Sequence, residues 1–261
     1  MPIAVARKVY RKARSISVGN GLSWRWLHNF GPTVKHMMAR PTLSEEARRV
    51  LADLNRDGIA VTSVEALLGD NSLYDEMVAT VDGLQDELSE EIEFARSQID
   101  GPRKSYVYNF LGSRPELDHN SIFARFSLQD QILGIANAYY GMRTKLVYYN
   151  VWRNFMTDAP PREAQLWHLD PDDLYVLKFF VNLVDVDENR GAFVYGKGTH
   201  RKGRDHVQPE EISAGGGLSE DSQMSDVLST DKWAICPGPK GTMIFADVRG
   251  YHKGGYARDR D

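Results

Sequence analysis

The sequence predicts a mainly β fold with N-terminal helices and a core that is a barrel or a double-sheet jelly roll. Apolar residues recur at helical intervals in the first half of the chain, whereas short runs rich in Val, Tyr, Phe and Trp succeed one another beyond Gly141. With 261 residues and 42% hydrophobic residues, the chain can bury one large core. We expect an N-terminal basic and aromatic segment at 1–41 and one domain at 42–261, with a helical layer at 42–141 and a β core at 142–261.

The N-terminal segment combines basic residues with three aromatic residues, Trp24, Trp26 and Phe30, and is interpreted as a docking segment. A weak membrane-surface contact is the alternative to a solvated helix end for its basic start. No apolar stretch approaches the roughly 20 residues of a membrane span, so we expect a cytoplasmic protein without a transmembrane segment. The net charge of −4 gives no overall basic field to attract nucleic acid. The sequence does not determine the oligomeric state.

Three helices are predicted in the first half of the chain. The first begins at Thr42-Leu43-Ser44-Glu45, which has the spacing of a capping box, and ends before Gly58. Carboxylates line one side of the second helix and are interpreted as a solvated face rather than a metal site. The predicted helices span 43–56, 73–97 and 128–140, and a short strand at 59–61 follows the first of them.

Six short strands are predicted beyond Gly141, separated by Gly, Pro and Asp turns, which is typical of a barrel or a double-sheet jelly roll. Residues 200–232 are polar, include three consecutive glycines and are expected to form an inserted mobile loop. The predicted strands span 145–152, 164–169, 174–184, 192–195, 233–236 and 242–248.

A possible metal site begins with His168 and Asp170, which lie two residues apart near the end of a predicted strand. Alternation along a strand places both side chains on one face. An isolated His-x-Asp pair is more often a surface pair, but His252 follows another predicted strand 82 residues after Asp170 and can supply a third ligand. Two imidazoles and one carboxylate leave three positions open, which suits Fe(II) that binds a bidentate co-substrate and O₂. Zinc is the chemical alternative.

Four landmarks in order resemble the phytanoyl-CoA dioxygenase-like family, and the resemblance covers residues 42–261. They are Trp167-His168-Leu169-Asp170, residues 184–193, residues 196–200 and residues 241–255. The resemblance implies a double-stranded β-helix, Fe(II) with 2-oxoglutarate and O₂, and hydroxylation of an unactivated C–H bond. By position it assigns the metal ligands to His168, Asp170 and His252. The carboxylate at 170 argues against a halogenase-type relative.

The resemblance also implies an arginine, eight to eleven residues after the distal histidine, that anchors the far carboxylate of 2-oxoglutarate. Arg258 and Arg260 lie six and eight residues after His252, and Arg260 is the favoured anchor. The alternative is that the anchor and the last strand lie beyond residue 261, which would leave the C-terminal strand incomplete.

Three further residues are candidates for contact with the co-substrate. Lys178 and Asn182 share one face of the predicted strand at 174–184, opposite an apolar face, and would point into the barrel mouth if the apolar face packs on the helices. A solvated edge is the alternative for Lys178. Tyr149 is either a hydrogen-bond partner of the co-substrate or a core tyrosine.

The resulting hypothesis is an Fe(II)- and 2-oxoglutarate-dependent dioxygenase that acts on a small molecule, lipid or sugar. Two alternatives remain at this point: a zinc hydrolase that uses the same three ligands to activate water, and a non-catalytic jelly roll that binds sugar or lipid. The sequence selects neither the substrate nor the position oxidised. His200 is expected to fix a loop rather than to bind the metal.

Overall fold

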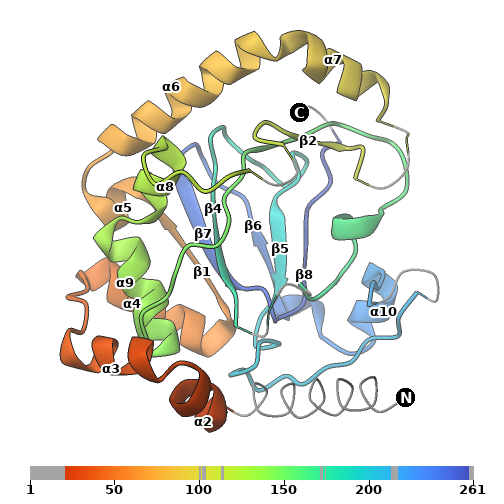
Figure 1. Ribbon diagram of the computed structural model, residues 1–261. Coiled ribbons are helices and arrows are strands. Elements are labelled where there is room, and N and C mark those ends of the chain that lie inside the picture. The colour runs from red at the N-terminus through yellow and green to blue at the C-terminus, as the bar shows by residue number, and fades with distance from the viewer. Residues whose placement is uncertain are drawn as a thin grey trace, which may run out of the picture.

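Helices form an outer layer around the strands of the protein, as seen in a computed structural model (Figure 1). In this view the helices run from α3 at the lower left to α7 at the top, and the strands lie inside this arc. The structure describes residues 21–99, 101, 104–112, 115–170, 173, 175–212 and 217–258. Arg260 and most of the predicted basic start, residues 1–20, therefore lie outside the described residues.

The helices are short and most of them precede residue 141. The α-helices are α2 (Gly21–Ser23), α3 (Phe30–Met38), α4 (Glu45–Asp57), α5 (Val64–Leu68), α6 (Ser72–Glu87), α7 (Ser89–Ser97), α8 (Ile122–Ser127), α9 (Asp130–Tyr140) and α10 (Asp221–Ser225). A π-helical turn, η1 (Trp24–His28), and two 3₁₀ turns, η2 (Glu163–Gln165) and η3 (Thr230–Lys232), complete the set in the described residues. None of the described helices is long and apolar enough to cross a membrane.

Local sequence signals explain where the predicted helices begin and end. The capping box predicted at Thr42 and Glu45 was wrong, because Ser44 is the N-cap of α4 and its hydroxyl accepts a hydrogen bond from the Ala47 amide. Gly58 ends this helix, as predicted, with a φ of 80°. α9 ends likewise at Gly141. The single helix predicted at 73–97 is two helices, because the chain departs from helical geometry at Leu88. α8 was not predicted.

Two three-stranded antiparallel sheets hold most of the strands. The first has the order β1 (Ile59–Ser63), β7 (Thr242–Asp247), β4 (Leu177–Val181), and the second has the order β6 (Trp233–Cys236), β5 (Phe193–Gly196), β8 (His252–Lys253). A separate two-stranded sheet joins β2 (Val107–Asn109) to β3 (Trp152–Asn154). Short sheets with helices therefore agree with the expected fold class.

Two strand predictions were wrong. Residues 145–151 are irregular, so only Trp152 of the stretch 145–152 belongs to a strand. Residues 163–165 form η2, and only Trp167 and His168 of the stretch 164–169 make β-bridges. The predictions for β1, β5, β6 and β7 agree with the structure to within two residues.

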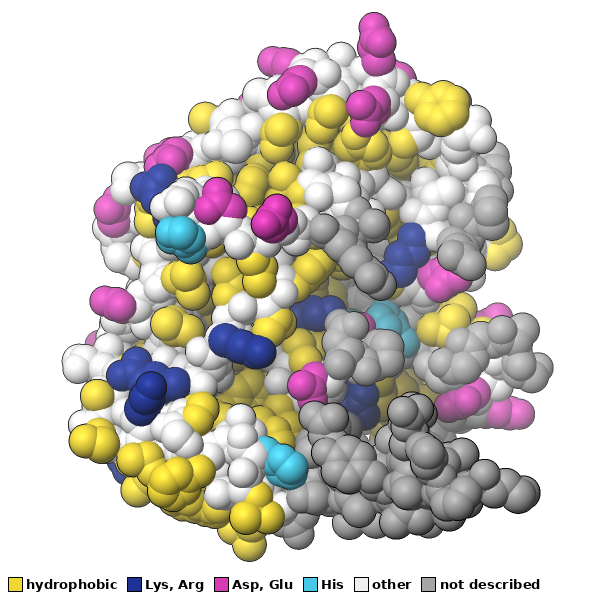
Figure 2. Space-filling model, viewed as in Figure 1, with side chains coloured by type: hydrophobic (Ala, Val, Ile, Leu, Met, Phe, Trp, Pro, Cys, Tyr) yellow, Lys and Arg dark blue, Asp and Glu magenta, His cyan; other side chains and the backbone are white. Residues whose placement is uncertain are grey.

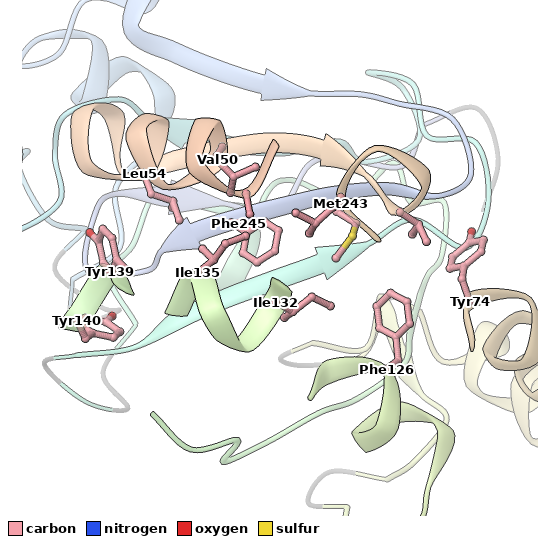
Figure 3. Packing of buried hydrophobic residues seen from close by; sticks show 14 of the residues in the cluster. Val50, Leu54, Tyr74, Phe126, Ile132, Ile135, Tyr139, Tyr140, Met243 and Phe245 are labelled. Carbon is pink, nitrogen blue, oxygen red and sulfur yellow. The ribbon is translucent and has the colours of Figure 1, made fainter. Parts of the chain in front are cut away.

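The main core lies between the helical layer and the first sheet. Val50 and Leu54 of α4 and Ile132 and Ile135 of α9 meet Phe245 of β7 (Figure 3). Each fully buried side chain of this size contributes about 1.5–3 kcal/mol relative to an exposed one. The helical layer thus fixes β7, the strand that leads to His252.

The alternation predicted for β4 is confirmed. Phe179 packs on the core beneath the helices, whereas Phe180 faces the opposite way and lies against Phe193 with ring centroids 4.7 Å apart. Lys178 therefore shares the side of Phe180, toward the second sheet.

The segment predicted as an inserted mobile loop contains ordered structure. α10 places Met224 in a buried cluster with Leu228 and Trp167. Asp221 accepts a hydrogen bond of 2.8 Å from the Trp167 indole nitrogen. The described part of this segment is therefore packed against the residue that precedes His168.

Candidate metal centre

His168, Asp170 and His252 converge at one end of the two sheets. One ligand atom from each lies within 4.8 Å of the others. The His168 and His252 Nε2 atoms are 3.6 and 3.8 Å from Asp170 Oδ1, and the imidazole centroids are 4.4 Å apart. Among the described residues, this is the one group of three His, Cys, Asp or Glu side chains that can hold a metal ion.

Backbone pairing places the two histidines side by side. The His168 amide donates to the His252 carbonyl at 3.0 Å, and the His252 amide donates back at 3.1 Å. Residues opposite each other in an antiparallel pair present their side chains on the same face. The Asp170 amide donates to the Val248 carbonyl at 3.1 Å, so the extended chain brings Asp170 to the same face as His168.

Each imidazole has one nitrogen tied to the backbone. His168 Nδ1 lies 2.8 Å from the Leu166 carbonyl oxygen, and His252 Nδ1 lies 3.0 Å from the Gly250 carbonyl oxygen. A carbonyl oxygen only accepts, so each Nδ1 carries a proton, and the other ring nitrogen, Nε2, faces Asp170. Metal-binding histidines are typically oriented in this way, and the donor set fits a divalent metal ion.

The electrostatics of the site favour an anionic Asp170 carboxylate beside a neutral His252 imidazole. Burial acts to raise the pKa of Asp170, but the polar interactions of its carboxylate with His168, His252 and Lys178 outweigh burial and hold that pKa well below its usual range. Burial, followed by the neighbouring His168, lowers the pKa of His252 to about 4. Asp170 and His252 therefore hold the protonation states that bind a metal ion at neutral pH.

Lys178 and Asn182 occupy different surroundings although both lie on the predicted face. Lys178 Nζ is 2.5 Å from Asp170 Oδ2. The other carboxylate oxygen, Oδ1, faces the two histidines. Asn182 lies about 13 Å further along the strand. Its side-chain amide donates a hydrogen bond to the Gly238 carbonyl at 3.3 Å. The structure brings Lys178 to the triad and places Asn182 at the far end of the strand.

The remaining predicted site residues make contacts of their own. The Tyr149 hydroxyl accepts a hydrogen bond from Ser121 and donates one to the Glu116 carbonyl. The exposed Arg258 guanidinium lies over the Tyr256 ring, with its carbon 5.4 Å from the centroid. His200 is fully buried and is not one of the three converging residues.

Sequence reasoning missed Arg249. Its guanidinium donates to the Asp170 carbonyl at 2.8 Å, and its amide donates to Asp247 Oδ1 at 3.1 Å. Arg249 thus ties the turn between β7 and β8 to the backbone of Asp170, a candidate metal ligand. Its position three residues before His252, inside one of the family landmarks, is the signal that could have identified it.

No protein-family model matches the sequence, and no curated protein is detectably similar to it. Solved structures do match. EctD from S. alaskensis with 2-oxoglutarate and 5-hydroxyectoine has a TM-score of 0.50 and 14% identity, over 84% of this chain and 77% of EctD. EctD with bound Fe gives a TM-score of 0.50 and 16% identity, over 85% and 74%.

A further match is SnoK, described as a non-heme alpha ketoglutarate dependent carbocyclase from nogalamycin biosynthesis, with a TM-score of 0.48 and 20% identity over 85% of this chain and 82% of SnoK. The two EctD structures contain 2-oxoglutarate and Fe, which are the co-substrate and the metal that the sequence resemblance implies. The similarity to EctD establishes a shared fold.

Proposed function

We propose that this chain is an Fe(II)- and 2-oxoglutarate-dependent dioxygenase, which hydroxylates an unactivated C–H bond of a small molecule, lipid or sugar. The observation that carries the proposal is the convergence of the three ligand atoms within 4.8 Å, with both Nδ1 atoms held by backbone carbonyls. The similarity to EctD, whose structures contain Fe and 2-oxoglutarate, supports it. The two three-stranded sheets are taken to form a double-stranded β-helix.

His168, Asp170 and His252 would hold the iron on one face and leave the opposite positions open. When bound, the iron and 2-oxoglutarate supply the activation of O₂ and the oxidising power for the C–H bond. The chain itself orients the ligands, keeps Asp170 anionic through Lys178, and limits water around His252, which is 4% exposed and packs against Phe193 at 5.6 Å. A dry, fixed site strengthens electrostatic interactions with bound groups.

Lys178 is the basic residue that the described contacts favour for binding the anionic co-substrate, since its ammonium group already reaches the triad. Arg260 remains the favoured anchor for the far carboxylate of 2-oxoglutarate on sequence grounds, with Arg258 as the second candidate. Tyr149 and Asn182 also remain candidates for contact with 2-oxoglutarate, although their observed contacts support this role less. A lysine acts on a carboxylate as a mobile point charge.

The test is Fe(II)-dependent conversion of 2-oxoglutarate to succinate under air, measured together with the iron content of the protein. Asp170→Ala should abolish turnover and leave the circular-dichroism spectrum unchanged, because the lost group is a ligand at a polar site rather than part of the core. Asp86→Ala on the exposed side of α6 is the matched control and should behave as wild type. Retention of turnover by Asp170→Ala, or zinc in place of iron with no succinate, would contradict the proposal.

A further inference from the structure

The outward side of residues 26–38 presents large apolar side chains to solvent. Leu27 is 76% exposed, Phe30 59% and Met38 82%, and Trp26 and Met37 are also exposed. Figure 2 shows hydrophobic side chains gathered at the lower left, over α2 and α3. We call the five residues Trp26, Leu27, Phe30, Met37 and Met38 the N-terminal apolar face. Contiguous exposed apolar surface of this kind marks an interaction site more often than scattered single residues do.

The inward side of the same segment is fixed to the domain. The Trp24 ring stacks on Tyr175 with centroids 3.5 Å apart and an interplanar angle of 19°. The Arg25 guanidinium donates to the Tyr140 carbonyl at 2.9 Å, and Thr33 and His36 of α3 are buried. Because these contacts set the orientation of the segment, the N-terminal apolar face cannot turn inward without breaking them.

Charge in this part of the chain is one-sided. Residues 1–40 contain eight of the 32 Lys and Arg residues and none of the 36 Asp and Glu residues. Their formal charge is therefore +8, and the remaining 24 basic and 36 acidic residues give −12 for the rest of the chain. Lys35 and Arg40 are exposed within the described part of the segment. The partner should consequently carry negative charge.

We propose that the N-terminal apolar face docks on an anionic lipid surface. Exposed Trp, Phe and Leu next to basic residues suit the boundary between headgroups and acyl chains, and the basic residues are attracted to anionic lipids. A symmetric contact with a second copy is disfavoured, because it would bring two positively charged segments together. Tyr175, against which Trp24 stacks, lies five residues after Asp170, so docking would hold the metal-bearing segment near the membrane surface.

Co-sedimentation of the full chain with vesicles tests this proposal. We expect binding to vesicles of phosphatidylglycerol and phosphatidylcholine in equal parts, weaker binding at high salt, and little binding to phosphatidylcholine alone. Leu27→Asp combined with Phe30→Asp should lower binding by roughly tenfold or more. Lys35→Gln and Arg40→Gln should each lower it by about fivefold. Phe94→Asp is the matched control, since Phe94 is 70% exposed on α7 outside the face.

Succinate formation in the absence of vesicles should be unaffected by the Leu27→Asp and Phe30→Asp changes, so failure of docking and failure of the proposed catalytic function are separate results. The docking proposal is overturned if anionic vesicles do not bind the wild type, or if Phe94→Asp weakens binding as much as the double change. The proposal is also overturned if vesicles bind neither the wild type nor the Leu27→Asp, Phe30→Asp variant, and analytical ultracentrifugation shows a dimer of the wild type that the variant does not form.

Discussion

His168 and His252 form a reciprocal antiparallel backbone pair, with amide-to-carbonyl hydrogen bonds of 3.0 and 3.1 Å. The two residues are 84 positions apart in the sequence, yet their imidazole centroids lie 4.4 Å from each other. Hydrogen-bonded backbone, rather than a loop, therefore sets the distance between two of the three candidate metal ligands. A site built in this way is organised before the metal binds.

Loss of either histidine should remove bound iron. We expect His168→Ala and His252→Ala to retain little iron after reconstitution, because two remaining ligands cannot replace the third. His200→Ala should keep iron close to one ion per chain, since His200 lies outside the converging group. Elemental analysis of the three reconstituted proteins checks this. Iron lost from His200→Ala but kept by His252→Ala would show that the ligands are wrongly assigned.

Lys178 should contribute to binding of 2-oxoglutarate. Replacing it with Met removes the cation next to Asp170, and a hydrogen bond to a charged group is worth about 1.5–3 kcal/mol. The KM for 2-oxoglutarate should therefore rise by roughly 10–100-fold. Lys232→Met is the control, because Lys232 pairs instead with Asp205.

The same Lys178→Met variant separates two roles of this residue. If iron affinity falls while the KM for 2-oxoglutarate stays unchanged, Lys178 serves only to orient Asp170. Iron titration in the absence of 2-oxoglutarate, followed by 2-oxoglutarate titration at saturating iron, distinguishes the two outcomes.

Metal-free protein should lose stability as the pH falls below neutrality. Burial and the neighbouring His168 lower the pKa of His252 from 6.5 to about 4 in the folded state, so the unfolded chain binds the proton first. The contribution of His252 to the free energy of unfolding is fully present above about pH 6.5. It declines as the pH falls to about 4, and the total loss is on the order of 3 kcal/mol. Urea unfolding at pH 7 and pH 4.5 should show this loss in the wild type, and a smaller loss in His252→Asn.

Several features were predictable because local chemistry decides them. Gly58 marks the end of α4 through a left-handed backbone, which does not depend on distant residues, and the start of this helix was predicted to within two residues. The alternation of Phe179 and Phe180 across β4 follows from the geometry of any strand. His168 and Asp170 reach one face for the same reason.

Other features depend on partners that the sequence does not specify. Residues 145–152 have strand-like composition, but β propensity describes a half-buried surface that needs a neighbouring strand. In this segment the Tyr149 hydroxyl instead bonds to the loop that precedes α8. The role of Arg249 is equally hidden, because its target is a backbone carbonyl 79 residues away.

Gly58 should tolerate no side chain, because two features act against one. Its φ of 80° is costly for any other residue, and an added Cβ would lie 2.6 Å from His200 Nδ1 and closer still to the Tyr195 hydroxyl, both of which are fully buried. Gly69 is the matched control: it has a similar φ of 67°, but an added Cβ there meets nothing within 4 Å.

We therefore expect Gly58→Ala to lower the free energy of unfolding of the metal-free protein by about 3 kcal/mol or more, and Gly69→Ala by about 1 kcal/mol. Urea unfolding of both variants measures the difference. Tyr195 also donates a hydrogen bond of 2.7 Å to the Asp247 carbonyl, two residues before Arg249, so its displacement should weaken iron binding in Gly58→Ala alone. Equal losses of stability in the two variants would mean that backbone strain, and not contact with Tyr195 and His200, determines the requirement for glycine at position 58.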